Sequence, residues 1–174
     1  KFGYRSRVMK HDEAEKYWKI RRESFSLLRK HVKGLHTAPF IDDIVVPVES
    51  LPEFMPKIQA ILDREKFIYT IAGHAGNGNF HIIPLLDFKK EGIADQVTRL
   101  SNEVYDLIAS YHGSITGEHN DGIVRTPYLH KQFSKQVLDL FNDIKTAFDP
   151  HVLFNPGKKV NGSIEVIKKY LVKE

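Results

Sequence analysis

The segment from Gly73 to His81 (GHAGNGNFH) constrains the fold of this chain more than any other. An Asn-Gly dipeptide between two β-rich runs is the strongest short-range signal for a β-hairpin. The flanking runs cover residues 67–72 and 80–85. With Asn77 and Gly78 at the two turn positions, His74 faces His81, and both side chains project from one face with Cβ atoms about 4.5–5.5 Å apart. The sequence therefore predicts two antiparallel strands that carry a pair of facing histidines.

Stretches with the apolar spacing of helices precede and follow this hairpin. We expect helices over residues 11–31, 50–65, 93–112, 132–148 and 163–172, and further β-rich runs over residues 4–9 and 41–46. Ser50, Pro52 and Glu53 have the pattern of a helix start, and Gly113 that of a helix stop. The side chains expected to face inward from the helix over 132–148 are Val137, Leu140, Phe141, Ile144 and Phe148. Few strands among amphipathic helices indicate an α+β fold with an antiparallel sheet and helices on one face.

Length and charge narrow the classes of protein further. The chain has 174 residues, a formal net charge of +4 and no cysteine. A chain of this length can bury roughly 70% of its unfolded surface, so one domain without disulfides is expected. The lack of cysteine also excludes thiol nucleophiles and iron–sulfur ligation by this segment. No apolar run approaches the roughly 18 residues of a membrane-spanning helix. Basic residues are interspersed with acidic ones, so nucleic acid is not an expected partner.

The two hairpin histidines can chelate one divalent cation, and a third ligand is available in the segment Gly117–Gly122 (GEHNDG). Glu118 would complete a His₂-carboxylate set, which catalytic metal sites use while leaving other positions open. Such a set admits Zn²⁺, Mn²⁺ or Fe²⁺. Asp121 is an alternative ligand that the spacing does not exclude. The competing interpretation is a hairpin with two surface histidines and a polar surface loop.

Two further residues point to chemistry on a small acid. His119 follows the proposed metal ligand directly, and an imidazole is suited to proton abstraction at neutral pH. Arg21 lies three residues after Trp18 and four before Phe25, on the apolar stripe of the first predicted helix. A charge on a core-facing stripe requires a partner. That partner is either a carboxylate of the protein or a substrate carboxylate, which arginine binds with two parallel hydrogen bonds.

Five segments, in this order, resemble the C-terminal half of the FAD-linked oxidases of the vanillyl-alcohol-oxidase type. They are Trp18–Arg21 (WKIR), Asp43–Glu49 (DIVVPVE), Gly73–His81, Gly117–His119 (GEH) and Phe154–Lys158 (FNPGK). Members of that family include D-lactate dehydrogenase, D-2-hydroxyglutarate dehydrogenase and the glycolate oxidase flavoprotein subunit. The resemblance implies a ferredoxin-like α+β sheet that covers the flavin. It also implies that residues 1–174 form a single substrate and metal domain, and that a separate N-terminal domain, absent from this chain, holds most of the FAD.

The same resemblance implies an FAD-dependent 2-hydroxy acid dehydrogenase, which oxidises a 2-hydroxy acid to a 2-oxo acid by hydride transfer to the flavin. The roles that it implies are metal ligation by His74, His81 and Glu118, catalysis by His119, substrate binding by Arg21 and cofactor contact by Asn155. The reduced FAD would pass its electrons to a quinone, an electron-transfer flavoprotein or a cytochrome. The chain alone would be inactive. The expected location is cytoplasmic or peripheral at the cytoplasmic membrane face, and a homo-oligomer is left open.

Four departures from the family pattern bear on the substrate. Members commonly have Asp in place of Asn77 and Gly in place of Asn120. The hydroxyglutarate enzyme has substrate-binding Lys and Asn residues at the positions of Ile41 and Ile83. Their absence favours a smaller or more apolar 2-hydroxy acid, such as D-lactate, or glycolate. The alternative hypotheses are a non-catalytic ferredoxin-like binding or assembly module with a structural or incidental metal site, and a stand-alone metal hydrolase.

Overall fold

The computed structural model describes residues 10–171, without the side chains of several residues between 21 and 31. The chain divides into two units, residues 1–36 and 37–174, which are described separately. The first contains helix α1 (His11–His31), which has the predicted bounds. The side chain of Trp18 on this helix is 51% exposed. The strand expected over residues 4–9 and the side chain of Arg21 lie outside the description.

The second unit is built on an antiparallel sheet. Strand β3 (Ile68–His74) pairs with β4 (Asn79–Leu86) along its whole length. The two-residue strands β1 (His36–Thr37) and β2 (Ile44–Val45) also pair with β4. Val45 of β2 in turn forms an antiparallel bridge with Ser114. The predicted antiparallel sheet is therefore present, although the β-rich run over 41–46 contributes only a short strand.

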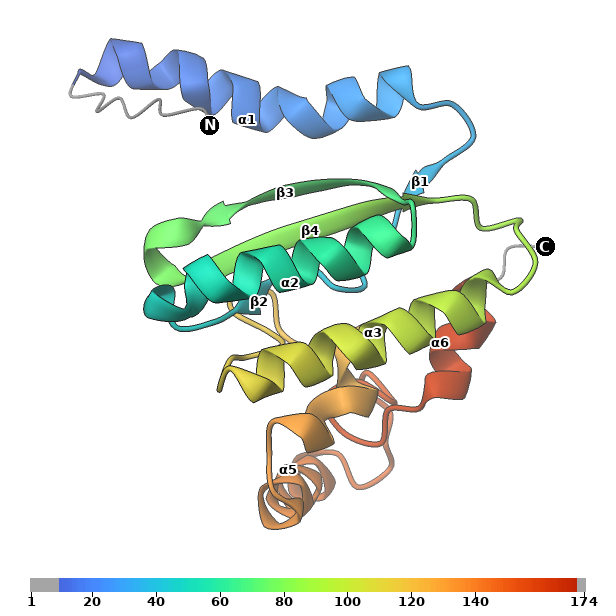
Figure 1. Ribbon diagram of the computed structural model, residues 1–174. Helices are drawn as coiled ribbons and strands as arrows, with labels where there is room; N and C mark the ends of the chain where they lie inside the picture. Colours follow the sequence, from blue (N-terminus) through green and yellow to red (C-terminus); the bar gives the residue numbers. More distant parts are fainter. Residues whose placement is uncertain (1–9, 172–174) are drawn as a thin grey trace. The chain divides into compact units, whose positions relative to one another are not determined.

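Helices α2 (Leu51–Arg64) and α3 (Ile93–Ser110) cover one face of this sheet (Figure 1). The side chains that form the core between sheet and helices include Phe80, Ile82 and Leu86 of β4, Phe54, Ile58 and Leu62 of α2, and Leu100, Val104 and Ile108 of α3. Because side chains alternate along a strand, His81 and Ile83 project from the opposite face of β4. The α+β class predicted from the sequence is confirmed, and the histidine-bearing face is the one turned away from α2 and α3.

The hairpin connection differs from the predicted two-residue turn. Residues Ala75–Asn77 form a single 3₁₀ turn and Gly78 follows with φ +67°. The register therefore places His74 opposite Asn79, and His81 opposite Ala72. The predicted pairing of His74 with His81 is wrong by two residues. A shift of two keeps every side chain on its face, so the two histidines still share one face as diagonal neighbours.

The predicted helix start at Ser50 and helix stop near Gly113 are close to the observed positions, but the hydrogen bonds and backbone conformations that form these two ends differ from the prediction. The Ser50 side chain makes no capping hydrogen bond, because residues Val48–Ser50 form a 3₁₀ turn (η1) that leads directly into α2. At the end of α3, the left-handed residue is His112, with φ +54°, and not Gly113. The Gly113 N–H then donates to the Ile108 carbonyl, which closes the last turn.

After Ser114, the described part of the chain forms four helical segments. They are α4 (Gly122–Arg125), the 3₁₀ helix η3 (Thr126–Lys131), α5 (Lys135–Phe148) and α6 (Ile164–Leu171). The sequence predicted α5 and α6 and missed α4 and η3. Figure 1 shows α6 against one end of α3, where Ile167 joins the core. Within residues 10–171, no helix has the length and apolarity required to cross a membrane.

The apolar stripe expected to face inward from α5 is largely exposed. Leu140, Ile144 and Phe148 are 55%, 52% and 86% exposed. Val137 and Phe141 of the predicted set are half-buried, and Phe141 packs edge-on against Phe133 with ring centroids 5.3 Å apart. Leu138, which was not in the predicted set, packs against the core. The prediction failed for Leu140, Ile144 and Phe148 because apolar spacing marks a stripe on a helix but does not say whether another element covers it.

Candidate metal and substrate site

One carboxylate oxygen lies at the centre of three imidazoles. Glu118 Oε1 is 3.2 Å from Nε2 of His81 and 3.7 Å from Nε2 of both His74 and His119. His74 ends β3, His81 lies within β4, and Glu118 and His119 lie in the loop that follows the Ser114 bridge. The His81 side chain is buried, whereas the other three are about half exposed. The structure thus brings together the four residues that the sequence singled out in these two segments.

The rings of His81 and His119 stack, with centroids 4.9 Å apart and planes 18° apart. A second carboxylate, Asp42, contacts the other edge of both rings. Its Oδ1 is 3.1 Å from His81 Nδ1 and its Oδ2 is 3.4 Å from His119 Nδ1. Sequence reasoning missed Asp42. The available signal was a pair of acidic residues inside the β-rich run over 41–46.

Asp43 holds the Glu118 loop in place. Its fully buried carboxylate accepts hydrogen bonds from the backbone N–H groups of Gly117, Glu118 and His119 and from the Asn79 amide. Burial alone would raise the pKa of Asp43, but these donors together lower it to about 2. Asp43 also has φ +62°, a backbone conformation that Asp tolerates better than most residues. The segment Asp43–Glu49 is one of those that carry the family resemblance, but the sequence did not indicate that Asp43 holds the Glu118 loop.

The described residues contain a compact group of potential metal ligands. One atom from each of Asp43, His81, Glu118 and His119 lies within 4.8 Å of the others. Both Asp43 oxygens are already occupied by hydrogen-bond donors, so we regard Asp43 as the anchor of the loop and not as a ligand. His74 adjoins the group through Glu118. Imidazole nitrogens together with a carboxylate oxygen suit a transition metal such as Zn²⁺, Mn²⁺ or Fe²⁺.

The alternative ligand, Asp121, does not join this group. Its side chain is buried and pairs with Lys159 Nζ. Asn155, the expected cofactor contact, lies in an exposed turn with φ +47° and accepts a hydrogen bond from Lys158. Ile41 is fully buried in the core and cannot line a substrate site, so the argument about substrate size built on it fails. Ile83, by contrast, is half-buried and shares the strand face of His81.

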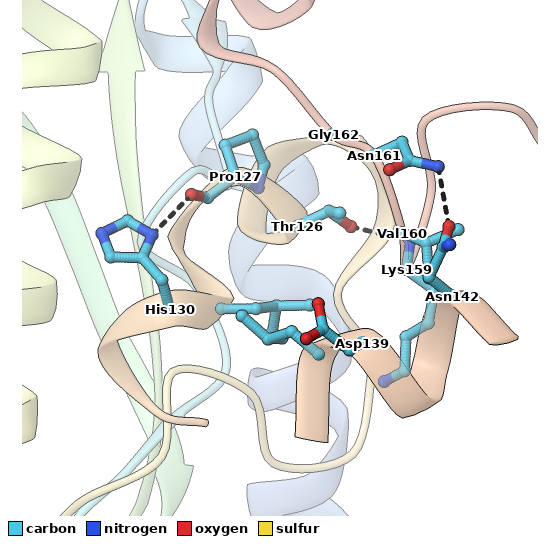
Figure 2. A pocket seen from close by; sticks show the side chains of 11 residues that line it. Thr126, Pro127, His130, Asp139, Asn142, Lys159, Val160, Asn161 and Gly162 are labelled. Carbon is cyan, nitrogen blue, oxygen red and sulfur yellow. Dashed lines mark hydrogen bonds between the residues drawn. The ribbon is translucent and has the colours of Figure 1, made fainter. Parts of the chain in front are cut away.

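Two cavities are relevant to ligand binding. One of about 410 Å³ opens beside Glu118. It is lined by Val45, His74, Asn77, Asn79, Gly117 and Glu118. The other, of about 310 Å³, is shown in Figure 2 and lies between η3, α5 and residues 159–162. Polar groups of this second cavity bind one another, such as Asn161 with Asn142 and His130 with the Pro127 carbonyl. The cavity beside Glu118 is the one that adjoins the converging imidazoles.

Comparison with known proteins identifies the family of this chain. Residues 3–159 match the family described as FAD linked oxidases, C-terminal domain. The chain is 33% identical to D-2-hydroxyglutarate dehydrogenase of Haemophilus influenzae over 83% of its own length and 14% of that protein. It is 34% identical to the mitochondrial D-lactate dehydrogenase [cytochrome] of Arabidopsis thaliana, over 85% of the chain and 26% of the relative. It is 29% identical to glycolate oxidase subunit GlcD of Bacillus subtilis, over 84% of the chain and 30% of the relative. The chain thus spans less than a third of each of these relatives, and it belongs to the family of FAD-linked oxidase C-terminal domains.

Proposed function

We propose that this chain is the substrate- and metal-binding domain of an FAD-dependent 2-hydroxy acid dehydrogenase. The observation that carries the proposal is the convergence of three imidazole Nε2 atoms on Glu118 Oε1. The family match supports it, because the relatives are named as dehydrogenases or oxidases of 2-hydroxy acids. A structural metal site is usually closed by four ligands, whereas catalytic sites use three and leave positions open.

We also infer that the sheet is ferredoxin-like. The chain order is β2, α2, β3, β4 and α3, followed by the bridge at Ser114. In space, Ser114 neighbours β2, β2 neighbours β4, and β4 neighbours β3, all antiparallel. A β-α-β-β-α-β unit is the ferredoxin-like motif. In this reading Ser114 marks the last, very short strand.

The residues that would hold a divalent cation are His74, His81 and Glu118. Their donor set fits such an ion, and the half-exposed side chains of His74 and Glu118 leave room for further ligands on the open side. A cation bound there would lower the pKa of a substrate hydroxyl, as bound metals do for water. Metal identity is not fixed by this donor set.

His119 is the proposed base. Its Nε2 lies 3.7 Å from Oε1 of Glu118, a residue that lines the cavity, and it would take the proton of the substrate hydroxyl. We assign the substrate carboxylate to Arg21 from the family resemblance alone. The flavin supplies the acceptor for the hydride from the substrate carbon, and another part of the protein would hold it, with Asn155 as a contact from this chain.

A small 2-hydroxy acid such as D-lactate or glycolate is the proposed substrate. The support comes from Ile83, which is apolar, half-buried and on the same strand face as His81. An apolar side chain there offers no hydrogen bond to a second carboxylate. The electron acceptor is proposed to be a quinone, an electron-transfer flavoprotein or a cytochrome.

Elemental metal analysis of the full-length protein tests the site, with a His74→Ala/His81→Ala double variant beside it. We expect about one transition-metal equivalent in the parent and none in the variant. His130→Ala is a suitable control, because His130 is exposed and bonds only to the Pro127 carbonyl among the contacts described. Equal metal in parent and double variant would reject the ligand assignment. Metal loss without any 2-hydroxy acid turnover in the parent would favour a non-catalytic module.

A further inference from the structure

We propose that Asp42 is the positioning residue that orients His81 and His119 together, so that Nε2 of each ring faces the cavity side occupied by Glu118. This inference rests on the proposed function, since it concerns how a metal ligand and a base are held. Nothing in the family match or the named relatives assigns a role to Asp42. The argument rests on its contacts with the two rings and on the way its own backbone is fixed.

One carboxylate serves two rings, with one oxygen for each. Oδ1 accepts a hydrogen bond from His81 Nδ1 at 3.1 Å, and Oδ2 lies 3.4 Å from His119 Nδ1. The Asp42 side chain is only 10% exposed, so water competes little for these oxygens. The near-parallel stacking of the two rings lets their Nδ1 edges meet the same carboxylate.

These contacts select the tautomer of each ring. A carboxylate can only accept, so Asp42 favours a proton on each facing Nδ1. The Glu118 carboxylate faces the Nε2 atoms at 3.2 Å and 3.7 Å, but no hydrogen bond to either Nε2 is among the contacts described, whereas His81 Nδ1 bonds to Asp42. We infer that Asp42 prevails, so that each neutral ring keeps its lone pair on Nε2. An unprotonated Nε2 is what His81 needs to bind a cation and what His119 needs to accept a proton. Carboxylates behind metal-bound histidines commonly have this effect, and their loss typically costs 10–100-fold in metal affinity or activity. Here a single carboxylate would set both rings.

Asp42 is itself held by a buried guanidinium. The Arg125 side chain is 7% exposed, and its Nη2 donates to the Asp42 carbonyl at 2.7 Å. Its Nη1 donates to the Asn120 carbonyl. Arg125 therefore ties the segment that carries Asp42 to the loop that carries Glu118 and His119. This link positions the Asp42 backbone relative to the loop that carries His119.

The direct test is to measure the tautomers by ¹⁵N NMR. Full-length, metal-free protein labelled with ¹⁵N only in histidine would be studied at mildly alkaline pH. We expect His81 and His119 to carry the proton on Nδ1, with assignments from His81→Gln and His119→Gln samples. Proton on Nε2 of either ring in the wild-type protein would overturn the proposal, whether or not any Asp42 variant folds.

Asp42→Asn supplies the second arm. The amide keeps one acceptor oxygen and gains a donor, so it can support the Nδ1-protonated tautomer of only one ring. We expect one ring to change tautomer, with metal affinity or kcat about 10–100-fold lower. Asp106→Asn removes the same charge from an exposed carboxylate on α3 that pairs with Lys131 of η3, and it should change neither the tautomers nor the metal affinity. Unchanged tautomers together with unchanged metal affinity in Asp42→Asn would contradict the proposal.

Full metal retention in the His74→Ala/His81→Ala variant would contradict the proposed function instead. The measured tautomers would still decide whether Asp42 orients the two rings.

Discussion

At the scale of single residues, His119 is distinguished from the proposed ligands by what its removal should do. Its side chain is about half exposed, stacks on His81 and faces the Asp42 carboxylate. We expect His119→Ala in the full-length enzyme to lower kcat by about 10²–10⁴-fold, the usual contribution of a general base. Bound metal and flavin should be unchanged, as measured by elemental analysis and flavin absorbance. Turnover at the wild-type rate would rule out His119 as the base.

Asp43 should matter for folding of the site more than for chemistry. Its carboxylate satisfies three consecutive backbone N–H groups of the Glu118 loop. Asp43→Asn would place an N–H₂ donor among these donors, and we expect a loss of about 1–3 kcal/mol in the free energy of unfolding. Denaturant titration measures it. Asp87→Asn, at an exposed turn where the carboxylate bonds only to Lys89 N–H among the described contacts, should lie within about 0.5 kcal/mol of wild type.

The residues that could be predicted from the sequence are those whose type is unusual for their surroundings. Histidines beside a hairpin turn and a Glu-His pair between glycines stand out without a structure. Asp42 and Asp43 do not, because their roles depend on rings and N–H groups that are distant in sequence. Asp43 and the His119 N–H, for instance, are 76 residues apart. Only the folded sheet brings them together.

At the scale of elements, the hairpin connection depends on Gly78. It has φ +67°, and a Cβ at this position would lie 1.9 Å from the Val46 carbonyl oxygen. We expect Gly78→Ala to destabilise the protein by more than the roughly 1–2 kcal/mol of a left-handed alanine, because the turn must also move away from β2. Gly76→Ala is the matched control, since Gly76 lies in the same turn with no atom within 4 Å of its Cβ and no positive φ. Thermal unfolding of both variants compares them, and equal stability would contradict this account of the turn.

Helix α5 offers a second test at this scale. Phe148 is 86% exposed, whereas Phe54 of α2 is fully buried. In this chain by itself, Phe148→Ala should change the free energy of unfolding by no more than about 0.5 kcal/mol. Phe54→Ala should cost about 3–5 kcal/mol, the usual effect of emptying a buried phenylalanine site. Urea unfolding curves give both values. A large cost for Phe148→Ala would mean that the stripe of α5 packs inward after all.

The elements show why periodicity predicts some features better than others. The bounds of α1, α2 and α3 follow from apolar spacing over many residues, and the structure agrees with them within about two residues. The hairpin loop and the short helices α4 and η3 span too few residues for any period to be read. Which face of α5 packs depends on its neighbours, which its own sequence does not describe.

At the scale of the whole molecule, the site is a consequence of sheet order. Val45 of β2 lies between Asn79 of β4 and Ser114, so three segments distant in sequence reach one end of the sheet. The segment around β2 carries Asp42 and Asp43, the β3–β4 hairpin carries His74 and His81, and the segment after Ser114 carries Glu118 and His119. The sequence could suggest an α+β fold and name most of the side chains. It could not show that the short β2 joins all three segments.

Acid stability of the whole domain should reflect two carboxylates with lowered pKa values. The Lys145 side chain, together with the N–H groups of Leu153 and Phe154, lowers the pKa of Asp149 to about 2, and Asp43 has a similar value. Because the folded-state pKa lies below the ordinary value of 3.8, each carboxylate stabilises the fold above about pH 4, and this stabilisation is lost as the pH falls toward 2.

Urea midpoints measured from about pH 5 down to about pH 2 should therefore fall for the wild-type protein. Asp149→Asn should be less stable than wild type at about pH 5, and the difference should shrink toward about pH 2, where about half of the wild-type carboxylate is protonated. Asp139→Asn, an exposed position on the same helix, should follow the wild-type curve throughout. A gap between Asp149→Asn and wild type that stayed constant with pH would show that the Asp149 contacts stabilise the fold independently of its charge.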